Sequence, residues 1–427
     1  MIRIIPFDTL KPEQILNRDI RAEADVEATV DAIIADVRAR GDDALKDYAR
    51  KFDHAELADL RVSQAEIDEA FAAVEPDFVE TLRMAADNIR AFHEQQVHKD
   101  ILFERAPGVL LGQKYTPIEK AGVYVPGGTA AYPSTVLMDV IPAKVAGVKQ
   151  IVMTTPAGPD GKVNPAILAA AVTAGIDLIF KTGGAQAVAA LAYGTQSIPA
   201  VDKIVGPGNI YVATAKRKVF GKVGIDMIAG PSEILVLADG KSDPDWVAAD
   251  LLSQAEHDRL ASPVLVTDSM DLAKAVQAEL EVQIPQLPRA AIARASVEEN
   301  GKIVVAENLD LAIDAVNIIA PEHLEICLDD PFAVLSRIKN AGSIFMGRNV
   351  PEALGDYFAG PNHTLPTSGT ARFSSPLSVD DFVKKSSFIY YTRDALGQVK
   401  DRIADFAEHE GLHAHARSVT IRFEGEE

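Results

Sequence analysis

The sequence predicts an α/β protein with two similar, doubly wound and mostly parallel domains and small helical extensions at both ends. At 427 residues the chain is too long for one small core, so two or more domains are expected. Beyond about residue 108, short β-branched runs alternate with helical segments, and this alternation later starts again. Such series form parallel sheets that are covered by helices on both faces.

The segment before that series, residues 24–98, is predicted to be helical. Its apolar residues recur at helical spacing, first through Val26, Val30 and Val37 and later through Leu82 and Ile89.

The first βαβ series covers residues 109–237. Its expected strands are 109–115, 122–125, 151–155, 178–181, 203–205 and 234–237. Its expected helices are 134–146, 165–174, 186–193 and 210–219.

The second series repeats the same alternation. Its expected strands are 264–267, 303–306, 324–328 and 343–346, and its expected helices are 245–257, 271–280 and 309–318. Two similar units in series indicate a duplicated, Rossmann-like architecture with its site in the cleft between them. Residues 347–380 are rich in Gly, Pro, Ser and Thr and are predicted to form a long functional loop.

Composition narrows the class of protein. A formal charge of -20 argues against nucleic acid or an anionic membrane as partner. The basic run 216–218 is interpreted as the solvated face of a helix. The single cysteine, Cys327, is expected in a buried strand, so any metal must use nitrogen and oxygen ligands. The N-terminal run 1–8 meets a charge too soon for a signal peptide, and we expect a cytoplasmic protein.

Histidine and carboxylate residues gather in the second half of the chain. Six of the nine histidines lie beyond residue 250, each with a carboxylate nearby, in the runs 254–258, 322–323, 356–363 and 408–415. Imidazole and carboxylate together suit either a hard-ligand metal site or a proton relay.

Each run also has a simpler explanation. Gln254 and His257 stand three apart at a helix end, which fits two ligands of one metal or a hydrogen bond on a helix surface. Glu322 and His323 lie in a helix-to-strand loop, suited to acid–base chemistry or to a surface ion pair. The loop 354–366 holds polar groups between Gly and Pro turns, and this constraint favours a shaped site over ordinary exposed loop chemistry.

The C-terminal run is the weakest of these signals. His413 and His415 point the same way in an extended segment and diverge in a helix. A polar tail is the simpler interpretation.

Three glycine-rich turns each follow an expected strand and precede an expected helix. They are 125–129, 182–186 and 205–209, and their backbone amides could bind phosphate. None matches the G-x-G-x-x-G fingerprint or a phosphate-binding P-loop, and tight turns alone would explain the glycines.

Together these segments resemble the histidinol dehydrogenase family from roughly residue 25 to residue 422. The most specific stretches are 122–128, 206–209, 229–233, 250–258, 320–324, 360–366 and 410–415.

The resemblance implies a zinc- and NAD-dependent oxidation of L-histidinol through histidinal to L-histidine, the last two steps of histidine biosynthesis. It implies that His323 is the general base and that Glu322 activates the water of the second step. The implied zinc ligands are Gln254, His257, Asp356 and His415. The implied substrate-binding residues are these four ligands with His323, Ser232, His363 and Glu410. The implied NAD contacts are Tyr124, Gln186 and Asn209.

The resemblance also implies a homodimer in which the C-terminal segment reaches into the neighbouring subunit, so that Glu410 and His415 complete the partner's site. We expect residues 1–22 to form an N-terminal extension. Residues 23–121 with 236–378 are expected to form a first α/β domain carrying most zinc and catalytic residues. Residues 122–235 are expected to form the NAD-contacting domain and 379–427 the exchanged segment.

The remaining histidines are expected to lie outside the site. We interpret His413 as a bystander and place four others, His54, His93, His98 and His409, on helix surfaces.

Three other functions stay open. One is a related dehydrogenase of another small alcohol, of the sulfopropanediol type. Another is a zinc hydrolase with Glu322 or Glu256 as base, and the third is a metal-stabilised binding protein. The presence of Glu322, Asp356, His363 and Glu410 together favours histidinol, because an imidazole-bearing cation needs acidic and imidazole partners.

Overall fold

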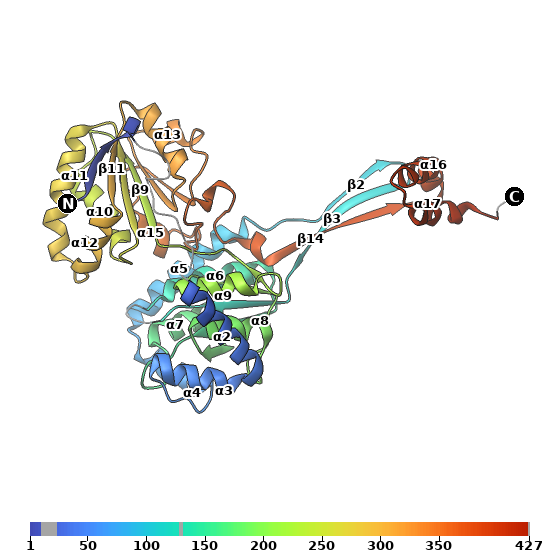
Figure 1. Cartoon of the computed structure of the whole chain (residues 1–427), viewed down its shortest axis with the longest axis horizontal. Helices are drawn as coiled ribbons and strands as arrows, with labels where there is room; N and C mark the ends of the chain where they lie inside the picture. The colour runs from blue at the N-terminus through green and yellow to red at the C-terminus, as the bar shows by residue number, and fades with distance from the viewer. Residues whose placement is uncertain (10–23, 128–130, 426–427) are drawn as a thin grey trace. The chain divides into compact units, whose positions relative to one another are not determined.

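The computed structural model describes residues 1–9, 24–127 and 131–425. The chain divides into two compact units, Met1–Gln96 with Ile118–Phe382, and Val97–Pro117 with Val383–Glu427. The first unit holds two parallel sheets covered by helices (Figure 1), so the predicted α/β class is confirmed. In the described part of the chain, no helix is long and apolar enough to cross a membrane.

One lobe of the first unit is built on a five-stranded parallel sheet, and we call it the five-stranded lobe. Its strand order is β6-β5-β4-β7-β8. The strands are β4 (Lys120–Tyr124), β5 (Gln150–Thr155), β6 (Ile179–Lys181), β7 (Lys203–Val205) and β8 (Gly224–Ile225). The helices after β4 to β7 are α6 (Pro133–Ala146), α7 (Pro165–Ala174), α8 (Gly184–Tyr193) and α9 (Ile210–Val219). Counted along the chain, the order is that of a doubly wound nucleotide-binding sheet.

The N-terminal helices pack against the helices of this lobe. They are α2 (Ala24–Arg40), α3 (Asp42–Tyr48), α4 (Gln64–Ala73) and α5 (Pro76–Glu94), with a π-helical turn at Ala49–Asp53. Val30 shares a core with Leu191, and Ile89 shares one with Leu137. The predicted grouping of 23–121 with 236–378 is therefore wrong for these helices. Helical periodicity reveals that a face is buried and says nothing of which sheet it covers.

The six-stranded lobe has the strand order β1-β11-β10-β9-β12-β13, all parallel. The strands are β1 (Arg3–Pro6), β9 (Glu233–Ala238), β10 (Ser262–Thr267), β11 (Lys302–Val305), β12 (His323–Cys327) and β13 (Ser343–Met346). Its helices are α10 (Pro244–Ala255), α11 (Met270–Gln283), α12 (Ala290–Glu299), α13 (Leu309–Ile319), α14 (Phe332–Leu335) and α15 (Glu352–Tyr357). Strands β9 to β13 repeat the order of the other sheet, which confirms the expected duplication.

Strand β1 lies at the edge of this sheet beside β11, so the first residues are a strand of the six-stranded lobe and not a separate extension. Residues 10–22 of that expected extension lie outside the described residues. The loop predicted at 347–380 is largely irregular, but it contains α15 and the 3-10 turns Thr370–Arg372 and Val379–Phe382.

Three buried side chains can be compared with the environments predicted for them from the sequence. Cys327 is buried in β12, as predicted. Lys216 is not solvated: it is 2 % exposed and pairs with Asp226. His93 is fully buried on α5, where its Nδ1 lies 2.7 Å from the Ile89 carbonyl oxygen, so its expected place on a helix surface is wrong.

The other histidines predicted to lie on helix surfaces are all exposed. His409 is the last residue of α16 (Arg393–His409). His54 lies just after the π-helical turn and His98 beyond the end of α5, so neither is inside a helix.

The second unit contains an antiparallel sheet in the order β14-β3-β2 and helices α16 and α17 (His413–Thr420). The strands are β2 (Ile101–Ala106), β3 (Val109–Pro117) and β14 (Val383–Tyr391). The strand predicted at 109–115 exists, but it pairs antiparallel with β14 instead of joining the parallel series. The C-terminal segment thus folds together with residues 97–117.

Candidate active site

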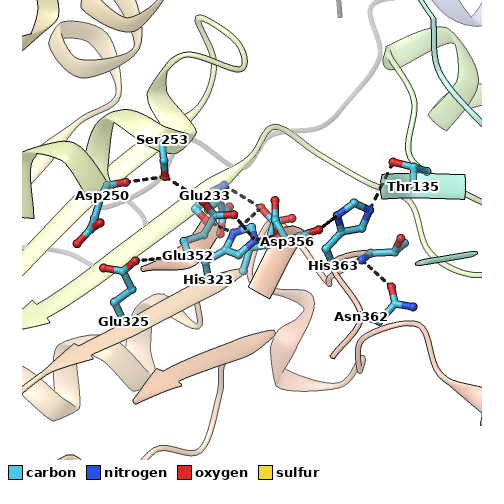
Figure 2. A network of polar contacts seen from close by, with 12 residues as sticks. Thr135, Glu233, Asp250, Ser253, His323, Glu325, Glu352, Asp356, Asn362 and His363 are labelled. Atoms are coloured by element: carbon cyan, nitrogen blue, oxygen red, sulfur yellow. Dashed lines mark hydrogen bonds and ion pairs between the residues drawn. The ribbon is translucent and has the colours of Figure 1, made fainter. Parts of the chain in front are cut away.

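The candidate site lies at the amino ends of two neighbouring strands, β9 and β12. Glu233 is the first residue of β9 and His323 the first residue of β12. Helix α13 ends before Ala320, whose left-handed backbone (φ 50°) turns the chain through Pro321 into β12. Glu322 and His323 are therefore buried at the start of a strand. Figure 2 shows His323 within a cluster of polar side chains.

Hydrogen bonding fixes the orientation of the His323 ring. Its Nδ1 lies 2.9 Å from the carbonyl oxygen of Glu233, which can only accept, so Nδ1 carries a proton. Nε2 faces Asp356 Oδ1 at 3.6 Å and Glu352 Oε1 at 3.8 Å. Within the described residues, neither Nε2 nor Glu352 Oε1 has a hydrogen-bond partner. Nε2 is therefore the ring nitrogen that is able to interact with a further group.

Charges around His323 shift its protonation and that of its neighbours. Burial alone lowers the pKa of His323, but the carboxyl groups of Glu322 and Asp356 outweigh burial and raise it to about 10. Burial raises the pKa of Glu322 to about 8. Burial also acts to raise the pKa of Asp356, yet His323 and His363 hold it well below its usual range.

The Glu322 carboxyl group is fixed from the neighbouring strand. Its Oε2 accepts the backbone amide of Glu233 at 2.9 Å and lies 3.6 Å from His323 Nδ1. The first amide of β9 thus holds an acidic group beside the imidazole.

Two helices bring further ligands toward Asp356. Gln254, near the end of α10, is 2 % exposed and hydrogen-bonds the Glu352 carboxyl group. His257 follows α10; burial lowers its pKa, and the nearby Asp356 carboxylate acts to raise it. Helix α15 begins after Pro351 and carries Glu352 and Asp356 four residues apart, hence on one face. Three of the four predicted zinc ligands therefore meet here.

Glu352 belongs to this cluster, although the sequence analysis did not select it. It is 3 % exposed, accepts the Ser253 hydroxyl at 3.0 Å, and its backbone amide donates to Glu325 Oε1 at 2.7 Å. His323, Glu352 and Asp356 each offer a ligand atom within 4.8 Å of the others. The spacing of four between two acids just after a proline was the signal available in the sequence.

A pair of carboxyl groups supports the cluster from behind. Glu325, in the middle of β12, and Asp250, on α10, have carboxyl oxygens within 4.8 Å of one another, and burial raises the pKa of both groups, that of Glu325 to about 9. The pair therefore shares a proton at neutral pH. Its position was also missed, because Glu325 stands in an apolar run that predicts only a strand.

His363 links the cluster to the five-stranded lobe. Its Nδ1 lies 3.1 Å from the Asp356 carbonyl oxygen, and its Nε2 lies 3.4 Å from Thr135 Oγ1 on α6. Figure 2 shows the ring between these two partners. Ser232, the remaining substrate residue predicted in this unit, directly precedes β9 and is half-buried.

The three predicted NAD contacts lie at the carboxyl ends of the five-stranded sheet. Tyr124 ends β4, is 4 % exposed, and its hydroxyl accepts the amide of Gly184 at 3.1 Å. Gln186, in the first turn of α8, is 3 % exposed. The Asn209 side chain caps α9 through the amides of Tyr211 and Val212.

The predicted turns at 182–186 and 205–209 follow strands and precede helices, as expected. Residues 128 and 129 of the first turn lie outside the described residues. Glu410 caps the end of α16 and His415 lies on α17, both exposed in the second unit. Their part in the site stays a prediction.

Two doubly wound sheets and a buried imidazole–carboxylate cluster define an α/β enzyme with an acid–base site. The family model described as histidinol dehydrogenase matches residues 16–423. The chain therefore belongs to the histidinol dehydrogenase family.

Individual relatives agree over nearly the whole chain. The histidinol dehydrogenase of Geobacter metallireducens is 56% identical over 428 residues, covering 100% of this chain and 98% of the relative. That of Bacillus subtilis is 58% identical over 394 residues, covering 92% of each. The crystal structure of histidinol dehydrogenase from Elizabethkingia anophelis has a TM-score of 0.95 at 39% identity, covering 99% of this chain and 98% of that one.

Proposed function

We propose that this protein oxidises L-histidinol through L-histidinal to L-histidine. In the first step the alcohol loses a proton to the enzyme and a hydride to NAD⁺. In the second step water adds to the aldehyde, and the hydrate gives a hydride to a second NAD⁺. Family membership supports an oxidoreductase of histidine biosynthesis. The observation that carries the proposal is the buried His323–Glu322 pair facing Asp356.

His323 takes the proton of the alcohol at Nε2. Because the Glu233 carbonyl fixes the proton on Nδ1, Nε2 is the nitrogen available as a base. The pKa of His323 is high because the carboxyl groups of Glu322 and Asp356 both raise it. Once Asp356 is engaged by another cation, that carboxylate no longer holds a proton on the ring, and Nε2 can accept one.

Glu322 activates the water of the second step. Its carboxyl group is buried beside His323, and burial raises its pKa to about 8. A carboxylate with a raised pKa is a stronger base than a free one, which suits proton removal from water near neutral pH.

The donor set around Asp356 suits a divalent metal. Gln254, His257 and Asp356 provide one amide oxygen, one imidazole and one carboxylate, and zinc accepts nitrogen and oxygen ligands. Among the described residues, His323 Nε2 and Glu352 Oε1 are buried without hydrogen-bond partners, which supports a cation bound beside them. We assign zinc to these three residues with His415 as the fourth ligand, where its charge would orient the substrate's imidazole and amine. Glu352 then holds Gln254 and is not itself a ligand.

The five-stranded lobe supplies the NAD site. In a doubly wound sheet a nucleotide binds outside the carboxyl ends of the strands, where Tyr124, Gln186 and Asn209 stand. A cavity of about 530 Å³ opens beside the same edge, lined by Gly127, Pro156 and other residues of this lobe.

We assign a homodimer with exchanged C-terminal segments, so that Glu410 and His415 serve the partner's site. The second unit exposes large apolar side chains of the kind that a second copy would cover. Leu102 on β2 is 61 % exposed, Ile389 on β14 is 74 % and Phe406 on α16 is 70 %. The expected cytoplasmic location remains a prediction.

One assay tests the function. The zinc-loaded protein is incubated with histidinol and NAD⁺, NADH is followed by absorbance, and the product is identified. We expect two NADH and one histidine for each histidinol. Absence of NADH would overturn the proposal, and NADH from a sulfonated propanediol but none from histidinol would select the related dehydrogenase.

A mixing experiment tests the exchanged segment. His415→Ala should lose zinc and activity, and His323→Asn should lose activity alone. A mixed dimer has one site with His323 and an intact partner tail, so mixing should restore turnover. No rescue in dimers shown to be mixed would exclude the exchange.

A further inference from the structure

Helix α6 holds the His363 loop on both sides of that residue. Asn362 Nδ2 donates to the carbonyl oxygen of Met138 at 2.6 Å, and Thr364 Oγ1 donates to Asp139 Oδ1 at 2.9 Å. We call these four residues the clasp. The loop runs from α15 of the six-stranded lobe onto the five-stranded lobe, where Phe358 and Leu377 pack in the same core as Leu137 of α6. The clasp therefore anchors the His363 loop on α6, beside the site.

The clasp is polar and fully inside the protein. Asp139 is 0 % exposed, Asn362 4 % and Thr364 5 %. Asp139 Oδ2 has no hydrogen-bond partner among the described residues. A buried polar atom without a partner costs free energy, and an apolar pair would hold the loop on α6 without that cost. The polar clasp therefore holds the His363 loop in one position on α6, although it lowers the free energy of unfolding.

The second oxygen of Asp139 lies against the Gly206 turn. A Cβ added to Gly206 would come within 3.0 Å of Asp139 Oδ2 and 2.1 Å of the Tyr124 carbonyl oxygen. The Gly206 carbonyl accepts Lys216 Nζ at 2.8 Å, and its amide donates to Asp226 Oδ2 at 2.9 Å. A buried ion pair thus fixes this turn, and Asp139 packs on its open side.

We propose that Asp139 is a positioning residue that sets the distance between the substrate loop and the NAD turn. One of its oxygens holds Thr364, next to His363, and the other abuts Gly206. The inference rests on the proposed function, which assigns His363 to histidinol and the Gly206 turn to NAD. Hydride transfer needs its two carbons in contact, and a displacement of about 1 Å can cost about 100-fold in rate.

Thr364→Val removes the hydroxyl and keeps the shape of the side chain. We expect kcat to fall by roughly 10- to 100-fold. With histidinol deuterated at the carbinol carbon, the isotope effect on kcat should rise, because hydride transfer becomes slower than the other steps. Thr364→Ser should restore both values. A purely structural defect would reduce the number of active molecules and leave the isotope effect unchanged.

Asp139→Ala should reproduce the effects of Thr364→Val. Because both changes break one contact, the double variant should lose no more than either single variant. Thr154→Val on β5 is the matched control: its hydroxyl is buried in the same lobe as Asp139 and has no hydrogen-bond partner among the described residues, so its isotope effect should be that of the wild type. A wild-type isotope effect in Thr364→Val, or additive losses in the double variant, would overturn the proposal.

A readout without turnover keeps this test separate from that of the proposed function. The nine histidines are labelled in the zinc-loaded protein, and the His363 ring signals are assigned with His363→Asn. We expect these signals to move in Thr364→Val and to stay in place in Thr364→Ser. If the wild type gives no NADH, the proposed function fails, and unmoved His363 signals would still overturn the clasp.

Discussion

The two parallel sheets share one strand order and place their proposed functional residues at opposite edges. In the five-stranded lobe, Tyr124 and Gly206 stand at the carboxyl ends of β4 and β7. In the six-stranded lobe, Glu233 and His323 stand at the amino ends of β9 and β12. Strand order alone predicts ligands at carboxyl ends in both sheets. The two lobes therefore share the order of their strands but not the edge of the sheet at which these residues stand.

Charged side chains explain why the six-stranded lobe differs. At the carboxyl ends of β9 and β12, Arg348 reaches Asp239 at 2.6 Å and Asp329 at 3.2 Å, so ion pairs occupy that edge. At the amino ends, the first amide of β9 is available and holds the Glu322 carboxyl group. A strand's amino end supplies a donor, which suits a carboxylate that must stay in place.

The largest effect should come from the amino edge of the six-stranded sheet. His323→Asn keeps a polar side chain and removes the base, so we expect kcat to fall by about 1,000-fold. Metal analysis should show zinc bound as in the wild type. Loss of zinc in this variant would mean that His323 is a ligand and that its assigned role is wrong.

Glu352→Gln should have the next largest effect. The change removes a charge between Gln254 and His323, and the loss of such a supporting group lowers metal affinity or turnover by about 10- to 100-fold. Zinc titration and kcat measure it. Glu307→Gln, at an exposed position in the same lobe, is the control. Equal behaviour of the two variants would remove Glu352 from the site.

Gly206→Ala tests the carboxyl edge of the other sheet. Gly206 has φ 114°, and a Cβ would strike the Tyr124 carbonyl, so the turn must shift. We expect KM for NAD⁺ to rise about tenfold and KM for histidinol to change little. Gly221→Ala separates backbone strain from the clash, because Gly221 has a similar φ of 98° and an added Cβ would meet no described atom within 4 Å. A rise confined to KM for histidinol would contradict the division between the sheets.

The smallest effect concerns pH. Burial, then the charge of Asp226, raises the pKa of Asp139 to about 8, whereas an unfolded aspartate titrates near 4. Folded protein therefore binds this proton more tightly, and the resulting stability is present below pH ~4 and lost as pH rises to about 8. Urea unfolding at pH 5.5 and 8 should show this fall, and Asp139→Asn should reduce it. An unchanged fall in the variant would show that Asp139 is ionised.

The sequence predicted much of the fold and of the site. The alternation of strands and helices located both sheets, and the motifs selected Gln254, His257, Asp356 and His323, which the structure brings together. Periodicity could not assign helices α2–α5 to a lobe, because the partner of an apolar face is set by tertiary packing. It also misplaced His93, whose burial depends on the distant loop at Asn362.

Polar residues outside any recognisable motif were the second kind of residue that the sequence could not place. Glu325 has no motif of its own, and the only sequence signal for Glu352 is its spacing of four from Asp356; folding brings both beside His323. Lys216 was misread for a similar reason, since its partner Asp226 follows in a separate turn.

A crystal structure with zinc and NAD⁺ bound tests the opposite use of the two sheets most directly. We expect the anomalous zinc signal among Gln254, His257 and Asp356, at the amino ends of β9 and β12. The nucleotide should lie across the carboxyl ends of β4 and β7, beside Gly206. Zinc or nucleotide bound instead beside Arg348, at the carboxyl ends of β9 and β12, would contradict this account.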